Sequence, residues 1–176
     1  MKKKLVILLG IILVVVLFIG GKKYMDKKAV EKDYQQGMKL IQTYVTEYLI
    51  DNYEGIEKIE WQGVGVEWRN SPVFGSSMFG NYVNSYVNVY ISEETYFTME
   101  FRLHDKAEYD YDKKKYIALD SLNPSNIDST LEMELRNTTR KLNGEEKIEF
   151  EKIRKADMGS KQAKTIYNLE IHELIY

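Results

Sequence analysis

The feature that most constrains this chain is an uninterrupted apolar run close to its N-terminus. Three lysines at residues 2–4 precede the run, which covers residues 5–19, and a Gly-Gly-Lys-Lys stretch at residues 20–23 follows it. A helix with no polar face is not expected to lie on the surface of a globular core. The pattern therefore predicts an export signal or a membrane anchor, joined to a domain formed by the rest of the chain.

The length of the run and the residues after it favour an anchor that is kept. As a helix, residues 5–21 span about 26 Å, close to the thickness of the apolar core of a bilayer. Cleavage requires small residues at the −3 and −1 positions, and the best candidate site places Ile19 and Gly21 there, which is a poor match. We expect residues 1–21 to be an uncleaved anchor or signal segment and residues 22–33 to be a juxtamembrane lead-in. Cleavage stays open as the alternative.

Lysines on both sides of the apolar run leave its orientation undecided by charge alone. The order of a short basic tail, an apolar core and a long polar domain is that of an export signal. We therefore expect a single-pass protein of the cell membrane, with its C-terminal domain extracellular.

Composition predicts one folded domain over residues 34–176. Aromatic residues make up 12% of the chain, including 14 tyrosines, and no repeat or linker divides it. Such a sequence is too apolar and too well patterned to be disordered. The absence of cysteine excludes disulfides, thiolate metal sites, cysteine nucleophiles and a lipid-modified cysteine.

Charge is unevenly distributed along this domain. The whole chain has a net charge of −2, but residues 34–112 carry 5 Lys and Arg against 13 Asp and Glu, a net charge of −8. Such a field disfavours binding to nucleic acid or anionic lipid. It favours a partner with a basic contact face.

Hydrophobic periodicity predicts an α+β fold in which a helix packs on a mainly antiparallel β-sheet. From Ile56 the period of the pattern is two, and glycines near residue 63 indicate a bulge before the alternation continues. A turn-rich loop follows at Arg69–Asn81. Before the strands, apolar residues three or four apart predict a helix over residues 27–52; they are Tyr34, Met38, Ile41, Val45 and Tyr48.

The next strands, at residues 82–91 and 96–103, predict a hairpin with one aliphatic face and one tyrosine-rich face. A charged hairpin tip at residues 104–115 leads to a strand near residues 116–119. A further helix is then expected, capped by Ser125 or Asn126 and closed by Gly144. Two last apolar runs, residues 148–153 and 165–175, predict a C-terminal hairpin.

Motifs for catalysis or metal binding are scarce. His104 and His172 do not lie at metal-ligand spacing, and Ser76-Ser77 lacks the glycines of a nucleophile elbow. Acidic residues alternate at positions 108, 110 and 112, but the glycine and the terminal glutamate of a calcium loop are missing. A solvated hairpin tip is the simpler interpretation. We expect no enzyme activity, no cofactor and no metal site.

The tyrosine-rich face of the predicted hairpin is the main candidate for function. Tyrosine gives a rigid, amphipathic contact, which suits protein recognition. The alternative is that a helix covers this face, so that the tyrosines are half-buried core residues. The candidate partner-binding residues are Glu60, Tyr82, Tyr86, Tyr90, Tyr96 and Glu100.

The layout of the first 103 residues resembles small anchored proteins of Gram-positive bacteria. After the basic tail, the anchor and a helix come Asn-Tyr-Glu-Gly-Ile-Glu-Lys-Ile-Glu-Trp (residues 52–61), Ser-Pro-Val-Phe-Gly (residues 71–75) and a strand rich in Tyr and Asn. This layout is similar to that of the streptococcal TipC-type immunity proteins, which accompany type VII (LXG) secreted toxins. The resemblance transfers no individual site residue.

The resemblance implies a non-enzymatic, membrane-anchored immunity protein. Such a protein would bind and block a cognate secreted toxin at the outer membrane surface of the producing cell. The alternative is a cell-envelope accessory or assembly protein of a secretion or cell-wall system. A toxin gene beside this one would favour the first interpretation, and a secretion or wall-synthesis cluster would favour the second.

Overall fold

The computed structural model describes residues 2–69 and 80–174, with side chains from residue 26 onward except that of Glu145. The chain divides into two compact units, Met1–Asp33 and Tyr34–Tyr176. The expected loop Arg69–Asn81 and the Ser76-Ser77 pair fall mostly or wholly within residues 70–79, outside the described residues.

The first unit is helical. Its backbone belongs to helix α1 (Lys2–Asn52), and the Lys28 ammonium pairs with the Glu31 carboxylate one turn later, at 2.8 Å. Across the described residues, we find no helix that combines the length and the apolar character needed to cross a membrane. The side chains of the expected anchor, residues 1–21, are not among those described.

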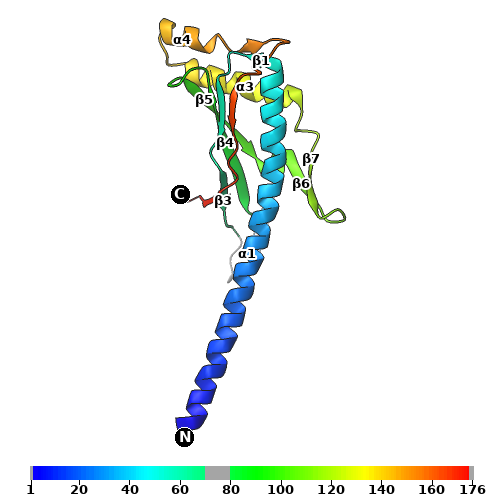
Figure 1. Cartoon of the computed structure of the whole chain (residues 1–176), viewed down its shortest axis with the longest axis vertical. Coiled ribbons are helices and arrows are strands. Elements are labelled where there is room, and N and C mark those ends of the chain that lie inside the picture. The colour runs from blue at the N-terminus through cyan, green and yellow to red at the C-terminus, as the bar shows by residue number, and fades with distance from the viewer. Residues whose placement is uncertain (1, 70–79, 175–176) are drawn as a thin grey trace. The chain divides into compact units, whose positions relative to one another are not determined.

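The second unit is an α+β domain whose main sheet is built around one long strand. Figure 1 shows the strands beside the later part of α1. The main sheet contains β2 (Lys58–Trp61), β3 (Val64–Glu67), β4 (Tyr82–Tyr90), β5 (Tyr96–Arg102), β9 (Lys164–Ile166) and β10 (Ile171–Glu173). The remaining elements are β1 (Tyr53–Glu54), α2 (Leu103–Lys106), β6 (Ala107–Asp110), β7 (Lys115–Ala118), α3 (Pro124–Thr139), α4 (Gly144–Phe150) and β8 (Arg154–Lys155).

Strand β4 pairs antiparallel with β5 on one side and with both β2 and β3 on the other. Because β2 and β3 pair with successive stretches of β4, they form one strand interrupted at Gln62-Gly63. Gly63 has a φ of +94°, a conformation that favours glycine, and the Gln62 amide donates to the Tyr86 carbonyl at 2.9 Å. The bulge expected near residue 63 is therefore confirmed as a break in pairing.

The far edge of the sheet is parallel. Strand β9 pairs in parallel with β2, and β10 pairs in parallel with β3. The break between β9 and β10 therefore lies beside the break between β2 and β3. The sheet is therefore mixed, with an antiparallel centre and one parallel edge.

The core lies between α1, α3 and one side of the sheet. Met38, Ile41 and Val45 are fully buried, and the Trp61 indole N–H donates to the Thr46 hydroxyl at 2.9 Å. The predicted apolar stripe of α1 is confirmed at these positions. Tyr48 differs, because it is only partly buried and Leu49 is fully buried beside it.

Helix α3 begins and ends earlier than predicted. Its N-cap is Asn123, whose side chain accepts a hydrogen bond from the Asn126 amide, and Pro124 occupies the first turn. Gly144 does not close this helix. It opens α4, which is preceded by a capping box between Asn143 and Glu146.

The predicted C-terminal hairpin is wrong. Ile148 and Phe150 belong to α4, and the short strand β8 pairs antiparallel with β1. Residues 164–173 instead supply both parallel edge strands of the main sheet. The hairpin tip expected at residues 104–115 is shorter than predicted, because the helical turn α2 and the strand β6 occupy its first part. The strand expected near residues 116–119 forms as β7, antiparallel to β6.

Candidate partner-binding face

All six candidate residues lie on the side of the main sheet that faces away from the core. Tyr86 pairs across the strands with Glu100, and Tyr90 pairs with Tyr96. Their immediate neighbours in β4 and β5 point the other way and are buried. We call the surface formed by these six residues the tyrosine face; its members are Glu60, Tyr82, Tyr86, Tyr90, Tyr96 and Glu100.

Helices α1 and α3 contribute to the core on the opposite side of the sheet. The hydrogen bonds from Trp61 to Thr46 and from Gln42 to Ser85 join α1 to side chains of β2 and β4 that alternate with the tyrosine face. Tyr86 and Tyr96 keep 41% and 45% of their surface exposed. The tyrosines of this face are therefore not core residues beneath either helix.

The Glu100 carboxylate organises one end of the tyrosine face. Its Oε1 accepts hydrogen bonds from the Tyr82 hydroxyl at 2.6 Å and from the Asn84 amide at 2.8 Å, with the Arg102 guanidinium 3.6 Å away. Burial alone would raise the pKa of Glu100, but these donors and the charge of Arg102 lower it. Burial and the bond to Glu100 raise the pKa of Tyr82 to about 12. Both groups therefore stay in their hydrogen-bonded forms at neutral pH.

A second cluster organises the other end. The Lys58 ammonium bonds the Glu60 carboxylate at 2.8 Å and also lies 3.7 Å from the centre of the Tyr90 ring. The Tyr90 and Tyr96 rings pack against each other with their centroids 4.9 Å apart and their planes tilted by 35°. The bond from Lys58 lowers the pKa of Glu60. Between the two ends, the Thr98 hydroxyl donates to the Asn88 side chain at 2.8 Å.

The charges of this face are balanced, which differs from the acidic surface expected from the sequence. Glu60 pairs with Lys58, Glu100 with Arg102, and the adjacent Glu67 with Arg69 at 2.7 Å. Lys164 lies in register with Lys58 on the neighbouring strand and adds one positive charge. The net charge of −8 in residues 34–112 is therefore not concentrated on the tyrosine face.

The cations were not among the candidate residues, although the sequence contained their signal. In β2 and β5 the period of two places Lys58 on the same side as Glu60, and Arg102 on the same side as Glu100. The ion pairs themselves could not be foreseen, because their formation depends on side-chain conformations and on the pairing register.

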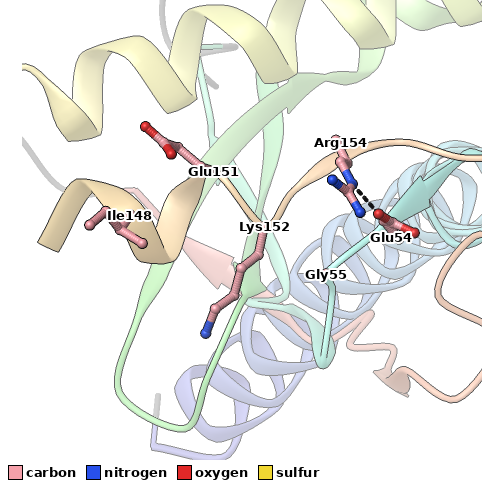
Figure 2. A pocket seen from close by; sticks show the side chains of 6 residues that line it. All are labelled: Glu54, Gly55, Ile148, Glu151, Lys152 and Arg154. Carbon is pink, nitrogen blue, oxygen red and sulfur yellow. Dashed lines mark hydrogen bonds and ion pairs between the residues drawn. The ribbon is translucent and has the colours of Figure 1, made fainter. Parts of the chain in front are cut away.

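A pocket of about 540 Å³ lies at another place, between α4 and the chain after β1 (Figure 2). The Arg154 guanidinium already pairs with the Glu54 carboxylate inside it, and the Lys152 ammonium bonds Glu149 at 2.6 Å. The remaining lining residues are Gly55, Ile148 and Glu151. These groups offer no nucleophile with an adjacent general base, and we assign no site to the pocket.

The other polar candidates are dispersed. His104, which lies on α2, packs edge-on against the ring of Tyr34 on α1. His172 lies on the edge strand β10. Asp110 accepts hydrogen bonds from the backbone amides of Asp112 and Lys113 and so shapes the β6–β7 turn. In the part of the chain that the structure describes, no three His, Asp or Glu side chains are grouped to hold a metal ion.

No family model matches this chain, and no curated protein or solved structure matches it significantly.

Proposed function

We propose that this chain is a non-enzymatic immunity protein, anchored in the membrane by residues 1–21, that binds and blocks a cognate secreted toxin at the outer membrane surface of the producing cell. The observation that carries the proposal is the tyrosine face, which lies opposite the helices and presents Tyr86 and Tyr96 about half exposed. Large aromatic side chains of this kind dominate the energetics of protein interfaces.

The contacts that order the side chains of the tyrosine face also support a binding role. Glu100 holds the Tyr82 hydroxyl, and the Lys58–Glu60 pair holds the Lys58 ammonium over the Tyr90 ring, so these two tyrosines are ordered before any partner arrives. A surface that is already ordered loses little side-chain entropy when it binds. A tethered domain of this type acts by occupancy, because an anchor raises its local concentration where the toxin arrives.

The proposal is tested by site-specific cross-linking in living cells. A photoreactive amino acid replaces Tyr86 in the full-length chain, or replaces Tyr111 as a control, since Tyr111 is 83% exposed in the β6–β7 turn. We expect a secreted toxin to be cross-linked from position 86 and not from position 111. Cross-links from position 86 to secretion or wall-synthesis machinery would instead support the envelope accessory role.

Protection from the toxin provides the second readout. The double variant Tyr86→Ala/Tyr96→Ala should lose protection while its expression and thermal stability stay close to those of the wild type. The control double variant Tyr111→Ala/Met158→Ala removes two large side chains elsewhere that are more exposed than Tyr86 and Tyr96, and it should protect normally. Full protection by the first variant would exclude the tyrosine face as the binding surface.

A further inference from the structure

The side chains of the tyrosine face differ in how far they are available to a partner, because some are already paired within the chain and others are exposed. Each of its two carboxylates has a cation beside it, and Glu100 also accepts hydrogen bonds from Tyr82 and Asn84. Tyr86 and Tyr96 are the large side chains of this face that remain about half exposed. The available contact surface is therefore aromatic, and its charges are engaged within the chain.

This inference rests on the proposed function. We infer that the partner's contact surface is uncharged, made of apolar, amide and hydroxyl groups that pack on Tyr86 and Tyr96. Glu60 and Glu100 are positioning residues, and they do not attract a basic partner. Glu100 lies opposite Tyr86 in the pairing of β4 with β5 and holds Tyr82, whereas Glu60 holds Lys58 over the Tyr90 ring.

The geometry around Glu100 argues against a contact with an incoming cation. Its Oε1 receives two hydrogen bonds of 2.6 and 2.8 Å, and Arg102 lies 3.6 Å away. A lysine or arginine of the partner would have to compete with Arg102 and lose its own hydration. The desolvation of a charge at an interface offsets most of what such a contact gains.

At the other end, Lys58 connects the carboxylate to the aromatic pair. Lys58 bonds Glu60 at 2.8 Å and lies over the Tyr90 ring at 3.7 Å. The Tyr90 ring in turn packs at a tilt against the Tyr96 ring. Glu60 thus acts on the exposed Tyr96 ring through two intervening side chains. This arrangement restricts the ring before binding, which is how a rigid aromatic contact keeps its entropic cost low.

The net charge of the face also argues against a basic partner. The three ion pairs Lys58–Glu60, Arg69–Glu67 and Arg102–Glu100 contribute no net charge, and Lys164 leaves a small positive excess. A basic surface would gain nothing by approaching this face. An uncharged surface can cover it without separating any of the pairs.

The test measures the affinity of the purified full-length chain, in non-ionic detergent, for the secreted protein that is cross-linked from position 86. Between about 50 and 500 mM salt, the Kd should change by less than about 3-fold, because screening weakens only contacts between net charges. Tyr86→Ala and Tyr96→Ala should each raise the Kd by about 10-fold or more, whereas the corresponding Phe variants keep the ring and should change it little.

The carboxylates are tested by conservative substitution. Glu100→Gln keeps an acceptor for Tyr82 and Asn84, and it should bind with a Kd within about 3-fold of the wild type and with the same salt profile, whereas Glu100→Leu should weaken binding. Affinity that falls more than about 10-fold with salt, together with loss of binding in Glu100→Gln, would overturn the inference and leave the proposed function intact. Absence of binding at every salt concentration would overturn both.

Discussion

The hydroxyl group of Tyr53 lies 2.7 Å from Oδ1 of Asp128 and donates a hydrogen bond to it. The Tyr48 hydroxyl donates to the same oxygen at 2.7 Å, and the Lys155 ammonium bonds the other carboxylate oxygen. These four side chains come from β1, α3, α1 and β8. A single carboxylate of α3 therefore joins the end of α1 and the adjoining β1 to β8, which is distant from them in the sequence.

Replacing Asp128 should destabilise the domain. Asp128→Ala leaves two partly buried hydroxyls and one ammonium without their acceptor, and we expect the free energy of unfolding to fall by about 1–3 kcal/mol. Urea unfolding of the full-length chain measures the change. Asp105→Ala is the matched control, since the Asp105 side chain is exposed, and it should stay within about 0.5 kcal/mol of the wild type.

The same carboxylate should make stability depend on acid pH. Burial tends to raise the pKa of Asp128, but the bonds from Lys155, Tyr48 and Tyr53 lower it below its ordinary value of 3.8. Its contribution is therefore fully present above the ordinary pKa and is lost as the pH falls through the lowered one. Unfolding curves from about pH 6 to pH 2 should show the wild type losing its advantage over Asp128→Asn in this window. A constant difference between the two would contradict the assignment.

The buried bond between Trp61 and Thr46 provides a third test. Both side chains are almost completely buried, so Thr46→Val should leave the indole N–H without a partner and cost about 1–3 kcal/mol. Trp61→Phe removes the donor as well. In a double-mutant cycle, the two substitutions together should cost less than the sum of the single changes. Strict additivity would mean that the bond contributes nothing.

Gly159 should tolerate no side chain. Its φ is +58°, and a Cβ atom there would collide with the backbone carbonyl oxygen of Ile50 at the end of α1. Gly159→Ala should therefore lower the free energy of unfolding by more than about 1 kcal/mol. Gly144 is the control, because a Cβ atom at that position meets nothing within 4 Å. Urea unfolding measures both variants, and Gly144→Ala should be close to neutral.

The high pKa of Tyr82 can be observed directly. Burial and the acceptor Glu100 raise the pKa of the Tyr82 hydroxyl to about 12, and Glu100→Gln removes the negative charge beside it. The pKa of Tyr82 should consequently move down towards the ordinary value of 10.0 in this variant. Nuclear magnetic resonance of ring-labelled tyrosine, assigned with Tyr82→Phe, measures both titrations. An unchanged pKa in Glu100→Gln would mean that burial alone produces the shift.

The strands of the tyrosine face were predictable because each one alternates cleanly over several residues. Val87 and Val89 are buried while Tyr86 is exposed, as a period of two requires. The helical stripe of α1 was equally clear, since Met38, Ile41 and Val45 repeat at helical spacing. Which side the helices cover was not predictable, because an aliphatic and a tyrosine-rich face can both accept a helix.

The C-terminal part was not predictable from hydrophobicity. Ile148 is 58% exposed although it stands in an apolar run. The nearby Phe150 is buried, and both residues belong to the short helix α4. The local signal that the hairpin prediction overlooked is the capping box from Asn143 to Glu146, which marks a helix start. The pairing of β9 and β10 with β2 and β3 depends on contacts more than 100 residues apart in the chain, so no short pattern reveals it.

This parallel edge also governs when the domain can fold during protein synthesis. Strands β2 and β3 lack one of their two neighbours until residues 164–173 have left the ribosome. Up to that moment, β2 and β3 form an edge of the sheet whose backbone groups are unpaired. Completion of the sheet is therefore a late event, and a chain that is still unfolded remains available to any machinery that transports extended polypeptides.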